Sequence, residues 1–167
     1  TYNEKENINN ILHAIFNLND GFHVLVIDDG SPDGTAQIVR ELIPKFSGKL
    51  FIEERTGKLG LGTAYIHGFK WAIEKGYQFI FEIDADFSHN PNDLPKLYNA
   101  CKNEGADVAV GSRYIKGGGV VNWPINRIAL SKGASLYTRM ITWMPVKDPT
   151  AGFVCYKKEV LETINLD

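Results

Sequence analysis

The sequence predicts an α/β domain with a mainly parallel sheet and helices on both faces. Short apolar runs, rich in β-branched and aromatic residues, alternate with longer segments whose apolar residues recur at helical spacing. That alternation is typical of parallel strands joined by crossover helices. The chain has 167 residues, of which 44% are hydrophobic, so it can bury the core of one domain. Because no repeat, low-complexity tract or linker divides it, we expect residues 1–167 to form a single domain.

The first half of the chain contains three predicted helices and three predicted strands. Apolar residues at i, i+3, i+4 and i+7 predict a helix over about 6–18. Residues 24–27 are all apolar, and three are β-branched, which is typical of a buried strand. The elements expected next are a helix over about 36–43, a strand at 50–52, a glycine-rich loop at 57–62, a helix over about 63–75 and a strand at 79–83.

The second half continues the alternation. The elements with clear signals are a helix over about 91–103, a strand at 108–110 and a helix that begins near 158. Asn126 can cap a long helix over about 127–143. The glycine-rich segment 117–119 is interpreted either as a loop that closes over substrates or as a plain surface hairpin.

Composition and missing motifs exclude several classes of protein. The net charge of −2 and the pI of about 6.1 give no sign of a nucleic-acid-binding surface. No apolar run approaches the roughly 18 residues that span a bilayer, and there is no signal-peptide pattern. The glycine-rich loop lacks the GK[ST] ending of a P-loop, and GxGxxG is absent, which excludes a Walker-type ATPase and a Rossmann dehydrogenase.

The segment 79–91, which reads FIFEIDADFSHNP, carries the strongest chemical signal. An apolar strand ends in Asp84 and Asp86, and residues i and i+2 of an extended segment point the same way. Paired carboxylates suit Mg²⁺ or Mn²⁺, whose further ligands in enzymes are commonly substrate phosphates. The alternative is that the acids only begin the next helix, but Asn90 and Pro91 already supply that start. We therefore predict a metal site that handles a phosphate group.

Charged residues also follow two other predicted strands. Asp28 and Asp29 end one strand and Arg113 follows another, so in a parallel sheet they should share an edge with Asp84 and Asp86. Each is ambiguous alone, because the loop that begins at Asp28 is rich in turn residues and Arg113 could be a surface arginine. Together they suggest a diphosphate site, in which Asp29 accepts hydrogen bonds from a base or ribose and Arg113 binds a phosphate.

Six motifs, in chain order, resemble those of the family 2 glycosyltransferases of GT-A fold, and most closely the dolichyl-phosphate (polyprenyl-phosphate) mannosyltransferases. They are TYNE, IDDGSPDGT, GKLGLGTAYIHG, DADFSHNP, GSRY and DPTAGF. The resemblance covers nearly the whole chain. It implies a metal-dependent, inverting transfer of a hexose, mannose from GDP-mannose, to a polyprenyl (dolichyl-type) phosphate.

The resemblance also assigns residues to the nucleotide-sugar donor. Tyr2 and Glu4 match positions that contact the nucleotide, and Ile27 and Asp29 match positions that hold the base and ribose. In the resemblance, Asp84, Ala85 and Asp86, together with Arg113, complete this donor site.

Asp84, Ala85 and Asp86 match the DxD motif, whose two acids bind Mg²⁺ or Mn²⁺ and the diphosphate. Ser88 matches a position where some relatives supply a third metal ligand, although a hydroxyl is a weaker donor than an amide oxygen.

Two arginines complete the catalytic set that the resemblance implies. Arg113 matches an arginine near phosphate, and Arg127 matches a basic position for the acceptor phosphate. A lipid phosphate is already an anion at neutral pH, so it can attack without a general base. Catalysis would then depend on positioning and charge. Asp148 remains a candidate base if the acceptor is a hydroxyl instead.

Two alternative functions stay open at this point. The first is a family 2 transferase that uses another sugar nucleotide, such as UDP-glucose, or a hydroxyl acceptor; a processive polysaccharide synthase is disfavoured because QxxRW is absent. The second is a non-enzymatic receiver-type signalling domain, in which Asp28, Asp29 and Asp84 would surround Mg²⁺. That fold needs a lysine at a later strand end, where this chain has Arg113.

Both ends of the sequence lack elements expected from the resemblance. The strand and proline that normally precede TYNE are absent, and so are the later elements by which such enzymes meet a bilayer. We therefore expect a single catalytic domain truncated at both ends. It should act at the cytoplasmic face of a membrane, to which parts outside this sequence would attach it.

Overall fold

The structure is a computed structural model, and it describes residues 1–18, 20–112 and 150–166, together with positions 133, 137, 138, 140, 141, 143, 146 and 148. Arg113, Arg127 and the segment 117–119 lie outside the described residues. Most of the helix predicted over 127–143 lies outside them too.

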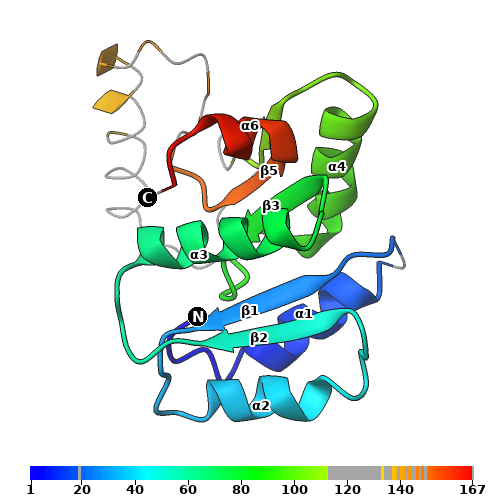
Figure 1. The fold of residues 1–167 in the computed structure, drawn as a ribbon, viewed down its shortest axis with the longest axis vertical. Coiled ribbons are helices and arrows are strands. Elements are labelled where there is room, and N and C mark those ends of the chain that lie inside the picture. The colour runs from blue at the N-terminus through cyan, green and yellow to red at the C-terminus, as the bar shows by residue number, and fades with distance from the viewer. Residues whose placement is uncertain are drawn as a thin grey trace.

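Helices and strands alternate as the sequence predicts (Figure 1). Predicted and observed boundaries agree within about two residues for most elements. The described elements are α1 (Ile8–Phe16), β1 (Val24–Asp28), α2 (Thr35–Leu42), β2 (Leu50–Glu54), α3 (Leu61–Glu74), β3 (Phe79–Ile83), the 3₁₀ turn η1 (Pro91–Asp93), α4 (Leu94–Lys102), β4 (Val108–Val110), β5 (Phe153–Lys157) and α6 (Lys158–Thr163).

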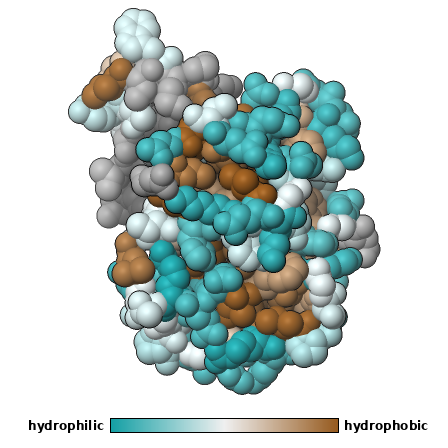
Figure 2. Space-filling view, viewed as in Figure 1, coloured by the Kyte–Doolittle hydropathy of each residue, from teal (hydrophilic) through white to brown (hydrophobic). Residues whose placement is uncertain are grey.

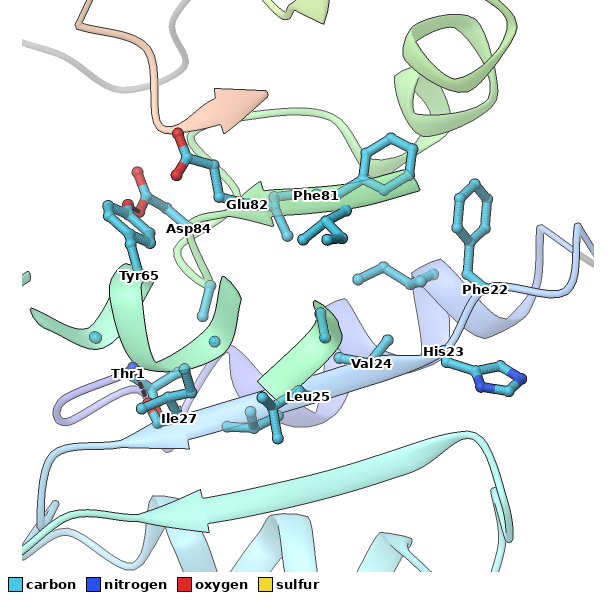
Figure 3. Close-up of a pocket in the computed structure, with 18 of the residues that line it drawn as sticks. Thr1, Phe22, His23, Val24, Leu25, Ile27, Tyr65, Phe81, Glu82 and Asp84 are labelled. Atoms are coloured by element: carbon cyan, nitrogen blue, oxygen red, sulfur yellow. Dashed lines mark hydrogen bonds between the residues drawn. The ribbon is translucent and has the colours of Figure 1, made fainter. Parts of the chain in front are cut away.

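The strands form a two-stranded and a three-stranded group. In the first, β1 pairs with β2 in parallel, with Val24 opposite Leu50 and Asp28 opposite Glu54. In the second, β5 lies between β3 and β4 and is antiparallel to both, so β3 and β4 run in the same direction. The arrows of β1, β2 and β3 point the same way in Figure 3, whereas that of β5 points the opposite way. The parallel arrangement is therefore confirmed for the strands that carry the site, and β5 is an antiparallel insertion.

Two hydrophobic clusters show that helices cover both faces. The larger cluster joins buried residues of α1, α4, β1, β2 and β5, with Val39 of α2. The smaller one joins Ala72 of α3, Ile80 of β3 and Leu161 of α6. Phe79 and Phe81, the neighbours of Ile80, pack instead against the larger cluster, as alternate residues of one strand should.

Helix α3 lies directly on the strand that carries the candidate donor residues. At Gly68 a Cβ atom would stand only 2.9 Å from the Cδ1 atom of Ile27, so a glycine permits this close approach. Figure 2 shows hydrophobic residues in the strip between α2 and α3, where β2 lies, with hydrophilic residues around them. Among the residues described, we find no helix whose length and hydropathy would let it cross a membrane.

The first five residues are tied to the loop that follows β1. The amide of Glu4 donates to Thr35 Oγ1 at 3.0 Å, and that of Lys5 donates to Asp33 Oδ2 at 3.1 Å. The hydroxyl of Thr35 in turn donates to Asp33 Oδ1 at 2.6 Å, and Thr35 is fully buried. This buried threonine therefore helps to hold the segment that carries Tyr2 and Glu4, together with hydrogen bonds from Thr1 to Ile27 and from Asn3 to Ser31.

Replacing this threonine should destabilise the fold. Thr35→Val keeps the shape of the side chain but leaves the Glu4 amide without its acceptor, which should lower the free energy of unfolding by about 1–3 kcal/mol. Thr163→Val is the control, because its exposed hydroxyl donates only to Val160 of its own helix and the expected change is within about 0.5 kcal/mol. If urea denaturation showed that the two variants lose the same free energy of unfolding, the role assigned to Thr35 would be contradicted.

Candidate functional site

A cavity of about 620 Å³ opens among β1, β3, α1, α3 and the N-terminal segment (Figure 3). Seven of the residues predicted to form the site line it: Tyr2, Glu4, Ile27, Asp29, Asp84, Ala85 and Asp86. Of the predicted site residues that the structure describes, Ser88 is the one outside this lining. Residues from two distant parts of the sequence thus meet because β1 and β3 run in the same direction and end on the same side of the cavity (Figure 3).

The carboxylate of Asp84 lies at the end of β3, between α3 and the segment before β5. The hydroxyl of Tyr65 donates to its Oδ1 atom at 3.3 Å. On another side, a Cβ atom at Gly152 would lie 2.6 Å from Oδ2, which is closer than non-bonded atoms approach. The half-buried carboxylate is therefore oriented by contacts from two elements remote in sequence.

The second acid of the pair lies on a turn rather than on an extended segment. Strand β3 ends at Ile83, and Ala85 and Asp86 form a turn before Phe87, whose φ is 57°. The amide of Ser88 donates to Asp86 Oδ1 at 2.9 Å. The prediction that Asp84 and Asp86 are i and i+2 of an extended segment was therefore wrong, since β3 ends at Ile83 and Asp86 accepts a hydrogen bond from the Ser88 amide within a turn.

Two tyrosines and two carboxylates share the face of β3 that is turned toward α3. Tyr156 of β5 donates to Glu82 Oε1 at 3.2 Å, as Tyr65 does to Asp84. Burial raises the pKa of Glu82 to about 7. The hydrogen bond from Tyr156 opposes this rise in pKa, and the charge of Asp84 adds to it. Burial and the nearby carboxylates also raise the pKa of both tyrosines, so both hydroxyls stay protonated and act as donors.

At the end of β1, Asp29 forms a buried ion pair that the sequence analysis missed. Arg55 donates from Nε to Asp29 Oδ1 at 2.7 Å and from an Nη atom to Oδ2 at 2.8 Å, and both side chains are 9% exposed. A second Nη donates to Thr63 Oγ1 at the start of α3. Because Arg55 directly follows β2, the rule that selected charged residues at other strand ends would have found it too. The pair fixes the carboxylate predicted to hold the base or ribose.

The neighbouring acid, Asp28, has a structural role. It is 1% exposed and accepts hydrogen bonds from the amide and the hydroxyl of Ser31 at 2.8 and 2.6 Å. Turn chemistry therefore accounts for Asp28. Nearby, the Lys58 ammonium lies 4.6 Å from the centre of the Tyr2 ring, so the glycine-rich loop contacts the N-terminal segment beside the cavity.

The donor atoms of the 84–88 turn fit a hard divalent cation. They are carboxylate and hydroxyl oxygens, and the close contact with Gly152 shows a carboxylate held in a defined place. Mg²⁺ in enzymes is commonly bound by one or two carboxylates together with substrate phosphates. Among the residues described, no group of three or more His, Cys, Asp or Glu side chains is arranged to hold a metal ion.

Asp148, the candidate base if the acceptor is a hydroxyl, is fully buried. Asp148 is 0% exposed, and the hydroxyl of Thr150 donates to its Oδ1 atom at 3.3 Å. Its carboxylate is thus part of the packing ahead of β5.

Parallel strands that end in acids beside a cavity are typical of α/β domains, which commonly bind ligands at the C-terminal ends of their strands. The chain belongs to glycosyl transferase family 2, whose family model matches residues 1–164. The receiver-type interpretation is therefore abandoned.

Three characterised relatives are similar over the whole chain. The polyprenol monophosphomannose synthase of Mycolicibacterium smegmatis is 45% identical over 99% of this chain and 62% of its own length. The undecaprenyl-phosphate mannosyltransferase of Micrococcus luteus is 41% identical over 100% of this chain and 68% of its own length. The dolichol-phosphate mannosyltransferase of Pyrococcus furiosus is 43% identical over 100% of this chain and 47% of its own length. The chain thus spans about half to two thirds of the length of these relatives.

Solved structures confirm the GT-A fold. A mannosyltransferase from Pyrobaculum calidifontis, in complex with GDP-Man and Mn²⁺, aligns with a TM-score of 0.61 at 20% identity over 100% of this chain and 46% of its own. Glucosyl-3-phosphoglycerate synthase from Mycobacterium tuberculosis, in complex with Mn²⁺, UDP and phosphoglyceric acid, aligns with a TM-score of 0.66 at 19% identity. The alignment covers 98% of this chain and 55% of that one.

The ion pair behind Asp29 should contribute strongly to stability. Arg55→Met leaves a buried carboxylate without its partner, so the free energy of unfolding should fall by about 3 kcal/mol. Arg40→Met is the matched control: its pair with Glu54 is 47% and 44% exposed, and the expected loss is below about 1 kcal/mol. If urea denaturation gave the two variants the same stability, the buried pair would not have the importance assigned to it.

Proposed function

We propose that this chain forms the catalytic domain of an inverting mannosyltransferase that moves mannose from GDP-mannose to a polyprenyl (dolichyl-type) phosphate. The observation that carries the proposal is that Asp84 and Asp86 line the same cavity as Asp29 and Tyr2. Where the two strands end, the β3 side of the cavity offers oxygens for a cation and diphosphate, and the β1 side and the N-terminal segment offer a carboxylate and an aromatic ring for a nucleoside.

The relatives support both the sugar and the acceptor. All three are named for mannose and for a polyprenol-type phosphate, at 41–45% identity over essentially the whole of this chain. The Pyrobaculum mannosyltransferase structure, whose likeness to this chain lies in the fold, is a complex with GDP-Man and Mn²⁺. We infer that GDP-mannose is the donor here.

On the donor side, each residue would have a separate task. Tyr2 and Glu4 would contact the nucleotide, while Ile27 and Asp29 would hold the base and ribose. The Arg55 pair keeps the Asp29 carboxylate in one orientation, so a nucleoside would meet an acceptor already in place.

Asp84 and Asp86, with Ser88 as a weaker third ligand, would hold Mg²⁺ or Mn²⁺. When bound, such an ion stabilises the negative charge that develops on the leaving diphosphate. Ala85, between the acids, would let the turn approach that diphosphate.

On the acceptor side, the reaction needs charge and position rather than proton removal. An oxygen of the lipid phosphate attacks the anomeric carbon, the new C–O bond forms, and the bond to GDP breaks with its electron pair leaving on the diphosphate. We propose that Arg113 and Arg127 bind phosphate groups during this step, although both lie outside the described residues. The complete burial of Asp148 supports a mechanism that uses no carboxylate base.

A polyprenyl phosphate would bring the reaction to a membrane surface. We therefore propose that residues 1–167 belong to one catalytic domain that works at such a surface. Its location at the cytoplasmic face stays a prediction from sequence.

The proposal is tested by incubating the full-length protein with Mn²⁺, labelled GDP-mannose and a polyprenyl phosphate, and measuring label in the organic phase. Asp84→Asn should lower the rate about 100-fold or more, because the leaving diphosphate loses its charge stabilisation. The control Glu41→Gln, an exposed change on α2, should retain the wild-type rate. Transfer from UDP-glucose but not from GDP-mannose would refute the donor, and normal turnover by Asp84→Asn would refute the metal assignment.

A further inference from the structure

Two residues outside the predicted site contact the Asp84 carboxylate. Tyr65, on the second turn of α3, points toward Asp84 in Figure 3, and its hydroxyl donates to Oδ1 at 3.3 Å. Gly152, just before β5, lies against the other carboxylate oxygen. One contact comes from a residue before Asp84 in the sequence and the other from a residue far after it, so the tertiary fold determines where this carboxylate lies.

The tyrosine is itself held in place. Its ring stacks on that of Phe69, four residues later on the same helix face, with centroids 6.4 Å apart and planes at 19°. Phe69 meets the ring of Tyr156 edge-on at 5.3 Å. The Tyr65 hydroxyl therefore sits at the end of a packed aromatic row and not on a freely rotating side chain.

The glycine contact leaves no room for a side chain. A Cβ atom at position 152 would stand 2.6 Å from Asp84 Oδ2, 3.1 Å from Cγ and 3.2 Å from Oδ1. Any substitution would push the whole carboxylate away from its present place or displace the backbone before β5. Glycine is thus required here by the position of Asp84 and not by a special backbone angle.

We propose that Tyr65 and Gly152 are positioning residues that fix the Asp84 carboxylate in the orientation needed to ligate the divalent cation of the donor diphosphate. This inference rests on the proposed function, because it assumes that Asp84 is a metal ligand. The physical reason is general: hydrogen bonds to ligating carboxylates orient them before the ion arrives, and their removal typically weakens metal binding 10–100-fold. Tyr65 acts through Asp84 and is not itself a ligand.

The test measures Mn²⁺ affinity directly, by electron paramagnetic resonance titration of the full-length protein in the presence of GDP. Tyr65→Phe removes the hydroxyl and keeps the stacked ring, so Mn²⁺ should bind about tenfold more weakly. In the transfer assay, the Mn²⁺ concentration for half-maximal rate should rise by a similar factor, while the rate at saturating Mn²⁺ stays close to that of the wild type. A residue with only a structural role would not give this recovery with added metal.

Tyr156→Phe is the matched control. It removes an equivalent hydroxyl from the same aromatic row, but that hydroxyl bonds Glu82 instead of Asp84. Its Mn²⁺ affinity should stay within about twofold of the wild type. Gly152→Ala supplies an independent second variant, and it should weaken Mn²⁺ binding at least as much as Tyr65→Phe, with folding checked by circular dichroism.

Asp84→Asn separates the possible failures. If it binds Mn²⁺ as the wild type does, or if the wild type binds none, the metal assignment of the proposed function fails and this inference falls with it. If Asp84→Asn loses Mn²⁺ but Tyr65→Phe binds normally, the proposed function stands and the positioning role is wrong. Equal weakening by Tyr65→Phe and Tyr156→Phe would likewise overturn it, because packing alone would then explain the effect.

Discussion

The confinement of carboxylates at the C-terminal ends of β1 and β3 is the constraint on which the rest of the site depends. A carboxylate taken out of water needs hydrogen-bond donors, and each acid here has them from a different element. Asp28 accepts from Ser31 in its own turn, Asp29 from Arg55 beyond β2, and Asp84 from Tyr65 on α3. Arg55 pairs the charge of Asp29, and the Tyr65 hydroxyl orients the Asp84 carboxylate.

Local signals in the sequence were sufficient for most of the fold. The run FIFEI predicted β3 with its observed bounds, and the Asn90 side chain accepts from the amide of Asn92 as the predicted cap. Strand β5 shows the limit of this reasoning, because the apolar run FVCYK packs equally well in either direction. Its antiparallel pairing with β3 and β4 is seen only in the structure.

The site was predictable where residues lie at strand ends and was missed where they lie elsewhere. Asp29, Asp84 and Asp86 follow from the rule that parallel strands share an edge, and they line one cavity. Tyr65 and Gly152 lie inside the motifs GKLGLGTAYIHG and DPTAGF, but neither follows a strand, so this rule does not select them. Their contact with Asp84 exists only once α3 and β5 pack on either side of β3. Tertiary contacts of this kind cannot be predicted from residue spacing or composition.

The most direct measurement of the central claim is a crystal structure of the full-length protein with Mn²⁺ and GDP, using anomalous scattering at the manganese edge. We expect one strong anomalous peak within bonding distance of Asp84 and Asp86, at about 2.0–2.2 Å from their oxygens, with the diphosphate completing the ligands. The guanine and ribose should lie toward Tyr2 and Asp29. A manganese peak remote from this turn, or GDP bound away from the cavity, would contradict it.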